Sequence, residues 1–129
     1  MSRVAVLGAG AWGTALADLL ARKGLEVRIW AHESEVADAI NREHCNPVYF
    51  GAAALDPRLT ASTDLAHVLD GAPVICSVAP SHVTRTLFQR AAPLVREGTQ
   101  LVCATKGIEP DSLALMSDVA AEVLPQASF

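Results

Sequence analysis

A glycine-rich hexapeptide, Gly8-Ala9-Gly10-Ala11-Trp12-Gly13, constrains the fold of this chain more than any other feature. It matches the pattern G-x-G-x-x-G and lies between a short apolar run, residues 3–7, and an apolar pattern of helical spacing over residues 12–23. In a strand–turn–helix setting Gly8 makes the tight turn, Gly10 lets a diphosphate approach the backbone, and Gly13 lets the helix pack on the strand. The free N–H groups and the dipole of the first helical turn would bind that diphosphate. We therefore predict a dinucleotide-binding turn, and the alternative is a glycine-rich turn that binds nothing.

The rest of the chain alternates between short apolar runs and helical patterns. Strands are predicted at residues 3–7, 26–30, 59–61, 73–78 and 101–104. Helices are predicted over residues 12–23 and 34–43, from a cap at residues 62–64 to about residue 69, from residues 80–81 onward, and from residues 110–111 onward. This order is typical of an α/β fold with a doubly wound parallel sheet, a Rossmann-type dinucleotide-binding domain. A further strand is due where the sequence stops, so we expect the domain to be truncated before its last strand.

The predicted final helix carries its apolar residues on one stripe. Its buried face would consist of Leu113, Met116, Val119, Ala120 and Val123.

Composition excludes several classes of protein. The 129 residues suffice for one domain, and 51% hydrophobic residues with 19% charged residues exclude disorder. Ten basic and 14 acidic residues, without a basic run, argue against nucleic-acid binding. The longest stretches without a charged side chain have 14 residues, too few for a transmembrane helix, which needs about 18. The N-terminal apolar stretch resembles a signal peptide, but its glycines and its helical continuation favour a retained N-terminus.

Three cysteines at wide spacings, Cys45, Cys76 and Cys103, predict neither a disulfide framework nor a zinc site. We expect a reducing, cytoplasmic compartment, with Cys76 and Cys103 as buried thiols because each lies in an apolar run. His44 and His67 show no spacing that favours metal binding, so no metal site is predicted.

The end of the second predicted strand bears on cofactor choice. Sheets that bind NAD usually place an Asp or Glu there to hold the ribose hydroxyls, whereas this chain has Trp30, Ala31 and His32. Without that carboxylate the 2′-phosphate of NADP meets less repulsion, particularly from a protonated His32. The pattern slightly favours NADP over NAD, although Glu33 follows directly and His32 could simply precede the next helix.

Two further segments follow predicted strands and would therefore lie at the ligand-binding edge of the sheet. Lys106 comes after residues 101–104 and would project a positive charge towards a substrate or nicotinamide, with Gly107 leaving room. Pro80, Ser81 and His82 would line the same rim, although Ser81 is equally explained as a helix cap and His82 as an exposed or structural residue.

Several motifs, taken in order, resemble one family. They are GAGAWGTALA at residues 8–17, Ile29-Trp30, residues 46–50, Pro80-Ser81-His82, and ATKGIE at residues 104–109. Together they resemble the N-terminal domain of bacterial NAD(P)-dependent glycerol-3-phosphate dehydrogenase, whose members interconvert dihydroxyacetone phosphate and sn-glycerol 3-phosphate for phospholipid synthesis.

The resemblance implies roles for individual residues. The backbone around Ala11 and Trp12 would contact the cofactor, His32 would lie near its adenosine ribose or 2′-phosphate, and Tyr49 would pack close to it. Lys106 would be shared between cofactor and substrate. The chain departs from the family's Tyr-Leu-Pro-Gly at Tyr49-Phe50-Gly51, which weakens the assignment of Tyr49.

The resemblance also implies an organisation. Residues 1–129 would be the cofactor domain, and a second, helical domain, absent from this chain, would supply the acid/base lysine and most of the substrate pocket. The fragment alone is then expected to be inactive, and the full-length enzyme could be a homodimer. Three alternatives stay open: the cofactor domain of another dehydrogenase, a non-catalytic dinucleotide-sensing module, and an S-adenosylmethionine-dependent transferase.

Overall fold

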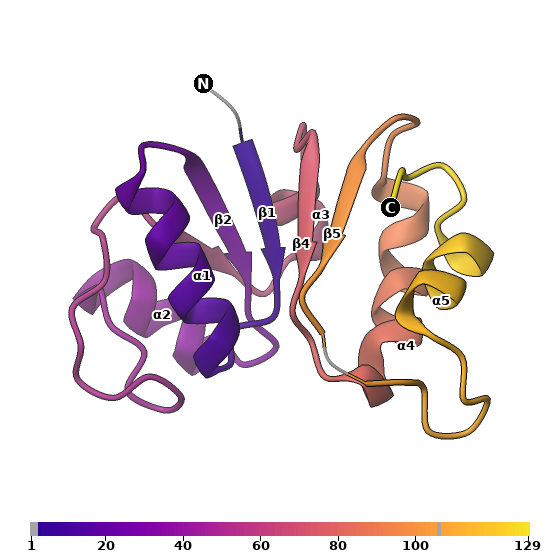
Figure 1. The fold of residues 1–129 in the computed structure, drawn as a ribbon. Helices are drawn as coiled ribbons and strands as arrows, with labels where there is room; N and C mark the ends of the chain where they lie inside the picture. The colour runs from indigo at the N-terminus through magenta and orange to yellow at the C-terminus, as the bar shows by residue number, and fades with distance from the viewer. Residues whose placement is uncertain (1–2, 106) are drawn as a thin grey trace.

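The computed structural model describes residues 3–105 and 107–129 (Figure 1). Its strands are β1 (Arg3–Leu7), β2 (Glu26–Trp30), β3 (Thr60–Ser62), β4 (Val74–Ser77) and β5 (Gln100–Cys103). Its helices are α1 (Ala11–Arg22), α2 (Ser34–Glu43), α3 (Leu65–Leu69), α4 (Ser81–Ala91) and α5 (Met116–Val123), with a 3-10 turn, η1, at Ala92–Leu94.

All five strands of the described sheet are parallel, in the order β3-β2-β1-β4-β5. The chain winds outward from β1 in one direction through β2 and β3, then returns to the other side of β1 as β4. Ligands of such sheets bind where the winding direction changes, beyond the carboxyl ends of the central strands. The predicted doubly wound α/β fold is confirmed.

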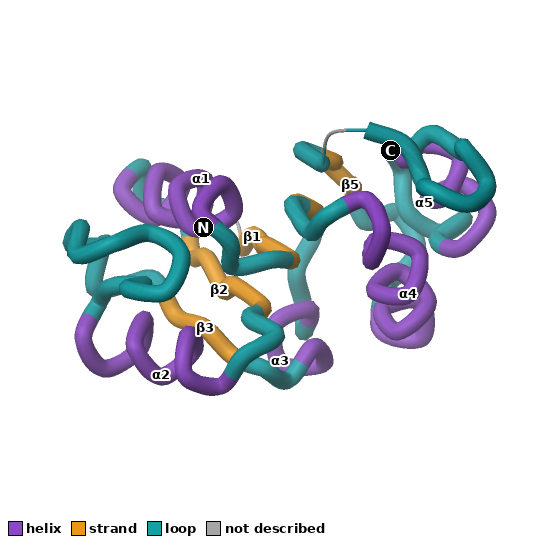
Figure 2. Tube along the Cα trace, turned by 90° about the horizontal axis from the view of Figure 1, so that it is seen from below, coloured by secondary structure: helices purple, strands orange, loops and turns teal. Residues whose placement is uncertain are grey.

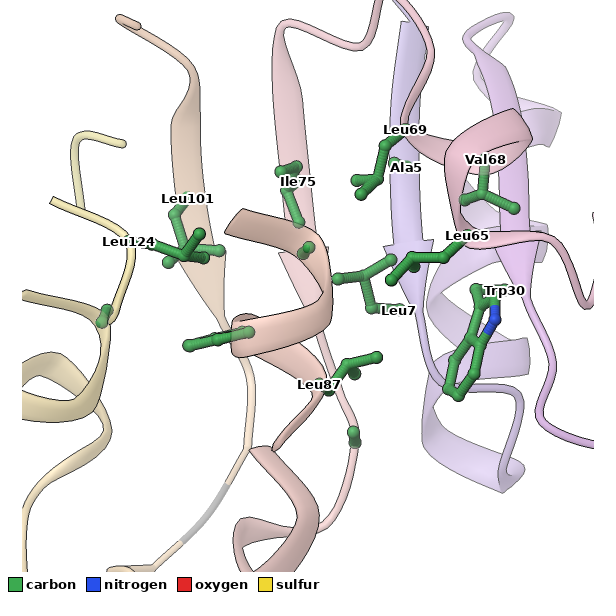
Figure 3. Packing of buried hydrophobic residues seen from close by; sticks show 14 of the residues in the cluster. Ala5, Leu7, Trp30, Leu65, Val68, Leu69, Ile75, Leu87, Leu101 and Leu124 are labelled. Atoms are coloured by element: carbon green, nitrogen blue, oxygen red, sulfur yellow. The ribbon is translucent and has the colours of Figure 1, made fainter. Parts of the chain in front are cut away.

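Strand β1 shows why the sheet is covered on both faces. Ala5 and Leu7 pack into one cluster with α3, α4 and α5, whereas Val4 and Val6 pack into a second cluster with α1 and α2. Because successive side chains of a strand point to opposite faces, an unbroken apolar run needs helices on both. Figure 2, which views the sheet from the carboxyl ends of its strands, shows α1 above it and α3 below it. Figure 3 shows the first cluster, in which Leu7 and Ile75 of the sheet and Leu65 of α3 lie beside α4.

The predicted start of the last helix is wrong. Residues 110–115 form a loop, and α5 begins only at Met116. Leu113 adopts a left-handed φ of 61° and is 67% exposed, so it does not belong to the buried stripe with Val119. The Leu115 N–H donates to the Asp118 carboxylate at 3.3 Å, which caps the helix at its observed start. An antiparallel bridge between Ile108 and Leu115 holds the loop in place of a helical turn.

Other predictions have mixed outcomes. Ser128 pairs in parallel with Gln100 at the free edge of β5, where the further strand was expected. Cys76 is buried as predicted, and burial raises the pKa of its thiol, but Cys103 is only partly buried. None of the helices within residues 3–105 and 107–129 is long and apolar enough to cross a bilayer.

Candidate dinucleotide-binding site

A cavity of about 570 Å³ opens at the carboxyl ends of β1, β2 and β4. It is lined by the glycine turn (8–13), the end of β2 and the start of α2 (30–33 and Val36), the segment after β4 (78–80), one face of α4, and Tyr49. The volume falls in the range of small-molecule sites, and the position is the switch point of the sheet. Of the eight predicted cofactor-binding residues, the structure brings all except Lys106, which lies outside the described residues, to this cavity.

The glycine turn has the geometry that its sequence predicts. Gly8 has a φ of +124°, which L side chains rarely adopt, and lies against the backbone of Ala79. A Cβ on Gly13 would lie 2.1 Å from the Gly8 carbonyl oxygen, so only glycine lets α1 pack this closely. A Cβ on Gly10 would meet nothing within 4 Å, because Gly10 faces open space. The glycines at 8 and 13 therefore serve the protein's own packing, whereas the one at 10 leaves room for another molecule.

The N-terminus of α1 presents free hydrogen-bond donors to the cavity. The first helical bond runs from the Thr14 N–H to the Gly10 carbonyl at 3.0 Å, so the N–H groups of Ala11 and Trp12 precede the helical ladder. The first turn carries no acidic side chain. Oriented donors and the positive end of the helix dipole together favour an anion.

Both a base and an acid lie at the end of β2. His32 is exposed and its ring centroid lies 6.0 Å from that of Trp30, while the next residue, Glu33, precedes α2. The Tyr49 hydroxyl donates to Glu33 Oε1 at 2.5 Å, and this hydrogen bond raises the tyrosine pKa. The contact places Tyr49 at the rim although its loop departs from the family pattern.

One face of α4 forms a wall that sequence reasoning missed. Val83, Thr86, Leu87 and Arg90 line the cavity at the spacing i, i+3, i+4, i+7. The Arg90 guanidinium carbon lies 5.5 Å from the Trp30 ring centroid, within the range of a cation–π contact. The helical stripe was a signal for this face, but nothing in the sequence indicates that it meets Trp30.

The segment after β5 reaches the same edge. The Thr105 hydroxyl donates to the Ala79 carbonyl at 2.6 Å, and Gly107 has a φ of +96°. Pro80 lines the cavity, Ser81 begins α4 without a side-chain capping bond, and His82 is exposed. Within the described residues, no group of three or more His, Cys, Asp or Glu side chains could hold a metal ion.

A second feature that sequence reasoning did not single out is a buried amide next to the glycine turn. Asn46 is fully buried, and its Nδ2 donates to the Ala9 carbonyl and to Thr14 Oγ1, both at 2.9 Å. The sequence singled out residues 46–50 only as part of a resemblance, because no local pattern shows which partner a lone Asn will meet.

The sequence of this chain matches a known protein family. The family described as the N-terminus of NAD-dependent glycerol-3-phosphate dehydrogenase matches residues 3–128, almost the whole chain. The chain belongs to this family.

Relatives of the glycerol-3-phosphate dehydrogenase family are similar across the whole chain. An NAD(P)+ glycerol-3-phosphate dehydrogenase of Rhodospirillum rubrum is 45% identical over 127 residues, which cover 98% of this chain and 36% of the relative. One of Mycobacterium bovis is 48% identical over 118 residues, covering 92% of this chain and 35% of the relative. The chain thus spans little more than a third of the length of these relatives.

The fold agrees with that assignment. A crystal structure of glycerol-3-phosphate dehydrogenase from Coxiella burnetii superposes with a TM-score of 0.90 at 38% identity, covering 98% of this chain and 38% of that one. A ketopantoate reductase from Ralstonia eutropha matches with a TM-score of 0.77 at 21% identity, which shows the shared fold alone.

Proposed function

We propose that this chain is the cofactor domain of a glycerol-3-phosphate dehydrogenase and that its cavity binds a nicotinamide dinucleotide. The observation that carries the proposal is the contrast among the glycines. Gly13 is required by the protein's own packing, whereas Gly10 faces empty space at the mouth of a cavity and beside the free donors of α1. A residue without a side chain at such a point is what close approach of a diphosphate requires.

The lining of the cavity supports the following placement of a dinucleotide. The diphosphate would lie on the N–H groups of Gly10, Ala11 and Trp12, and the adenosine would lie between His32 and the wall of α4 that carries Arg90. When bound, such a cofactor supplies the hydride donor or acceptor of a redox reaction. The chain's own residues orient it and shield it from water.

For the whole protein we propose the interconversion of dihydroxyacetone phosphate and sn-glycerol 3-phosphate. The relatives, which carry that activity in their names, are nearly three times as long as the part matched here. We assign the acid/base lysine and most of the substrate pocket to the helical domain of such a full-length protein. Lys106 is proposed to attract the substrate phosphate, since it follows β5 by three residues in the sequence and carries a positive charge.

We further propose that the site accepts NADP as well as NAD, with a slight preference for NADP. Arg90 and His32 both line the cavity, where Arg90 offers positive charge to a 2′-phosphate and His32 can donate a ring N–H to it. Glu33 opposes this preference, although its carboxylate is engaged by the Tyr49 hydroxyl.

Calorimetric titration of the chain with NADH and NADPH, at low salt, tests the proposal. Gly10→Val is the decisive variant because its side chain fits the free protein but occupies the path of the diphosphate. Ala66→Val, on an exposed position of α3 away from the cavity, is the matched control. We expect binding by the unchanged chain and by the control, and at least a tenfold loss in Gly10→Val, of the order of one buried charge-assisted contact. Equal binding by Gly10→Val, or no binding by the folded chain, contradicts the proposal.

The role of Lys106 needs a separate test in the full-length protein. Lys106→Ala is expected to raise KM for dihydroxyacetone phosphate at least tenfold while changing the affinity for NADH much less, because the lost charge is the one proposed to attract the substrate phosphate. Equal losses in both would contradict a substrate role.

A further inference from the structure

We propose that Asn46 is a positioning residue that aims the Gly10 N–H at the diphosphate and holds the turn at residues 46–50 against the glycine turn. The inference rests on the proposed function and deepens it. It concerns a side chain that need not touch the ligand and acts through the backbone of the glycine turn.

Two buried side chains fix the orientation of the peptide group between Ala9 and Gly10. Asn46 Nδ2 and Thr14 Oγ1 both donate to the Ala9 carbonyl oxygen, at 2.9 and 3.3 Å. In a trans peptide the C=O and the following N–H point in opposite directions, so fixing the Ala9 carbonyl fixes the direction of the Gly10 N–H. No acceptor for that N–H is found in the described part of the chain. The carbonyl is thus held on the buried side, and the N–H is directed away from Asn46.

The side-chain amide of Asn46 is buried together with the Thr14 hydroxyl. Asn46 and Thr14 are both fully buried, so their polar atoms must be satisfied within the protein. Asn46 Nδ2 also donates to Thr14 Oγ1 at 2.9 Å, and its Oδ1 accepts from the Tyr49 N–H at 3.3 Å. A fully buried side chain with this many bonds has little freedom, so it transmits its own position to the Ala9 peptide.

The turn at residues 46–50 connects the glycine turn to the β2–α2 junction through hydrogen bonds at both of its ends. Residues 46–50 form a compact turn closed by the Phe50 N–H on the Asn46 carbonyl at 2.7 Å. One end of the turn binds the glycine loop through Asn46, and near its other end Tyr49 binds Glu33 at the β2–α2 junction. The glycine turn and the β2–α2 junction are the two turns between which the adenosine diphosphate part of the ligand is proposed to lie. Asn46 therefore sets the direction of a donor at the glycine turn, whereas the Tyr49–Glu33 hydrogen bond holds the rim on the adenosine side.

The test compares two asparagines that bond to the backbone in similar ways. Asn46→Asp keeps the shape and the Oδ1 acceptor but replaces the donor with an oxygen that repels the Ala9 carbonyl. Asn41→Asp is the matched control, because Asn41 Nδ2 donates to the Ala61 carbonyl and its Oδ1 accepts from the Ala61 N–H, both at 2.8 Å and outside the cavity. Thr14→Val is a milder variant that removes the hydroxyl bonded to Ala9 and Asn46, and it tests the same peptide orientation if Asn46→Asp does not fold.

Affinity is measured for NADH, for ADP and for adenosine, with thermal unfolding recorded for each variant. Asn46→Asp is expected to lower the affinity for NADH and for ADP about tenfold or more. Thr14→Val is expected to lower these affinities about threefold, which is the scale of one misplaced or lost hydrogen bond. Adenosine, which lacks the diphosphate, should change less than about twofold, a selectivity that general destabilisation would not produce. Asn41→Asp should leave all three affinities unchanged.

The outcomes separate the inference from the proposed function. Normal NADH binding by folded Asn46→Asp and Thr14→Val, or equal losses for ADP and adenosine, overturns the role of Asn46 and leaves the proposed function standing. Failure of the unchanged chain to bind NADH overturns the proposed function, and the inference with it.

Discussion

Asp56 and Arg58 illustrate how single residues fix the loop that borders the cavity. Arg58 binds both Asp56 carboxylate oxygens, at 3.0 and 2.8 Å, and its Nη2 also donates to the Ala21 carbonyl of α1. The Asp56 N–H in turn donates to the Asp18 carboxylate at 2.7 Å. These contacts attach the end of the loop to the first helix and limit how far it can move from the glycine turn.

The acid stability of the fold should depend on this pair. The Arg58 hydrogen bonds lower the Asp56 pKa to about 2, below the value of about 3.9 for an unfolded chain. A lowered folded-state pKa gives a stabilisation that is complete above about pH 4 and is lost as the pH falls towards 2. Asp56→Asn should therefore lower the free energy of unfolding at pH 7, and its difference from the unchanged chain should shrink between about pH 4 and 2. Urea unfolding at several pH values between about 2 and 7 measures this difference in the free energy of unfolding, and Asp70→Asn is the control at an exposed position. A pH-independent difference would exclude the charge as its cause.

Glu33 should decide how strongly the site discriminates between NADPH and NADH. Its carboxylate lies at the rim near His32, where a 2′-phosphate would come close to like charge. Glu33→Gln keeps an oxygen acceptor for the Tyr49 hydroxyl but removes the charge, so we expect NADPH to bind several-fold more tightly while NADH changes less. Titrations with both cofactors measure the ratio, and Glu35→Gln, in the first turn of α2 but outside the cavity lining, is the control. An unchanged ratio would place the 2′-phosphate elsewhere.

At the scale of elements, the contact between α1 and β1 depends on a single missing side chain. Gly13→Ala places a Cβ 2.1 Å from the Gly8 carbonyl oxygen, and backbone atoms must shift to admit it. We expect a loss of about 3 kcal/mol or more in the free energy of unfolding, seen as a fall in Tm of about 10 °C. Gly10→Ala, in the same turn but facing open space with φ −72°, should change Tm by no more than about 2 °C. Similar falls in both variants would contradict the division of roles between the two glycines.

The elements differ in how far the sequence could predict them. Strands β1 and β2 begin and end where apolar runs do, because a strand buried on both faces has a pattern of its own. The start of α5 was missed because Leu113 and Met116 share a helical spacing, while the pairing of Ile108 with Leu115 and the Asp118 cap act against a longer helix. Periodicity alone contains no information about such competing contacts.

The same distinction applies to the candidate site. The glycine turn comes just after β1 in the chain, and His32 comes just after β2. Their place in the fold could therefore be predicted from the sequence. Asn46 reaches the glycine turn through its contact with Ala9, and Arg90 lines the cavity beside Trp30, and both partners are far away along the chain. Which long-range partners meet depends on the packing of whole helices and loops, and a single sequence does not reveal it.

At the scale of the whole molecule, the cavity joins the two helical layers. Its lining comes from α1 and α2 on one face of the sheet and from α4 on the other, with the ends of β1, β2 and β4 between them. A ligand that contacts all of these elements should stabilise the entire domain, because unfolding any one of them would release it.

Ligand binding should therefore raise Tm for the cooperative unfolding of the whole chain. At a concentration one hundred times Kd, NADH contributes about 2.7 kcal/mol, which corresponds to a rise in Tm of about 8 °C for a domain of this size. Gly10→Val should unfold near the temperature of the ligand-free chain and show at most about half of that rise at the same NADH concentration, because a tenfold weaker affinity leaves about 1.4 kcal/mol. Hydrogen exchange should slow in β1, β2 and β4 together, which connect both layers. Protection confined to residues 46–50 would instead indicate a ligand held by the loop alone, without the coupling between layers that the position of the cavity predicts.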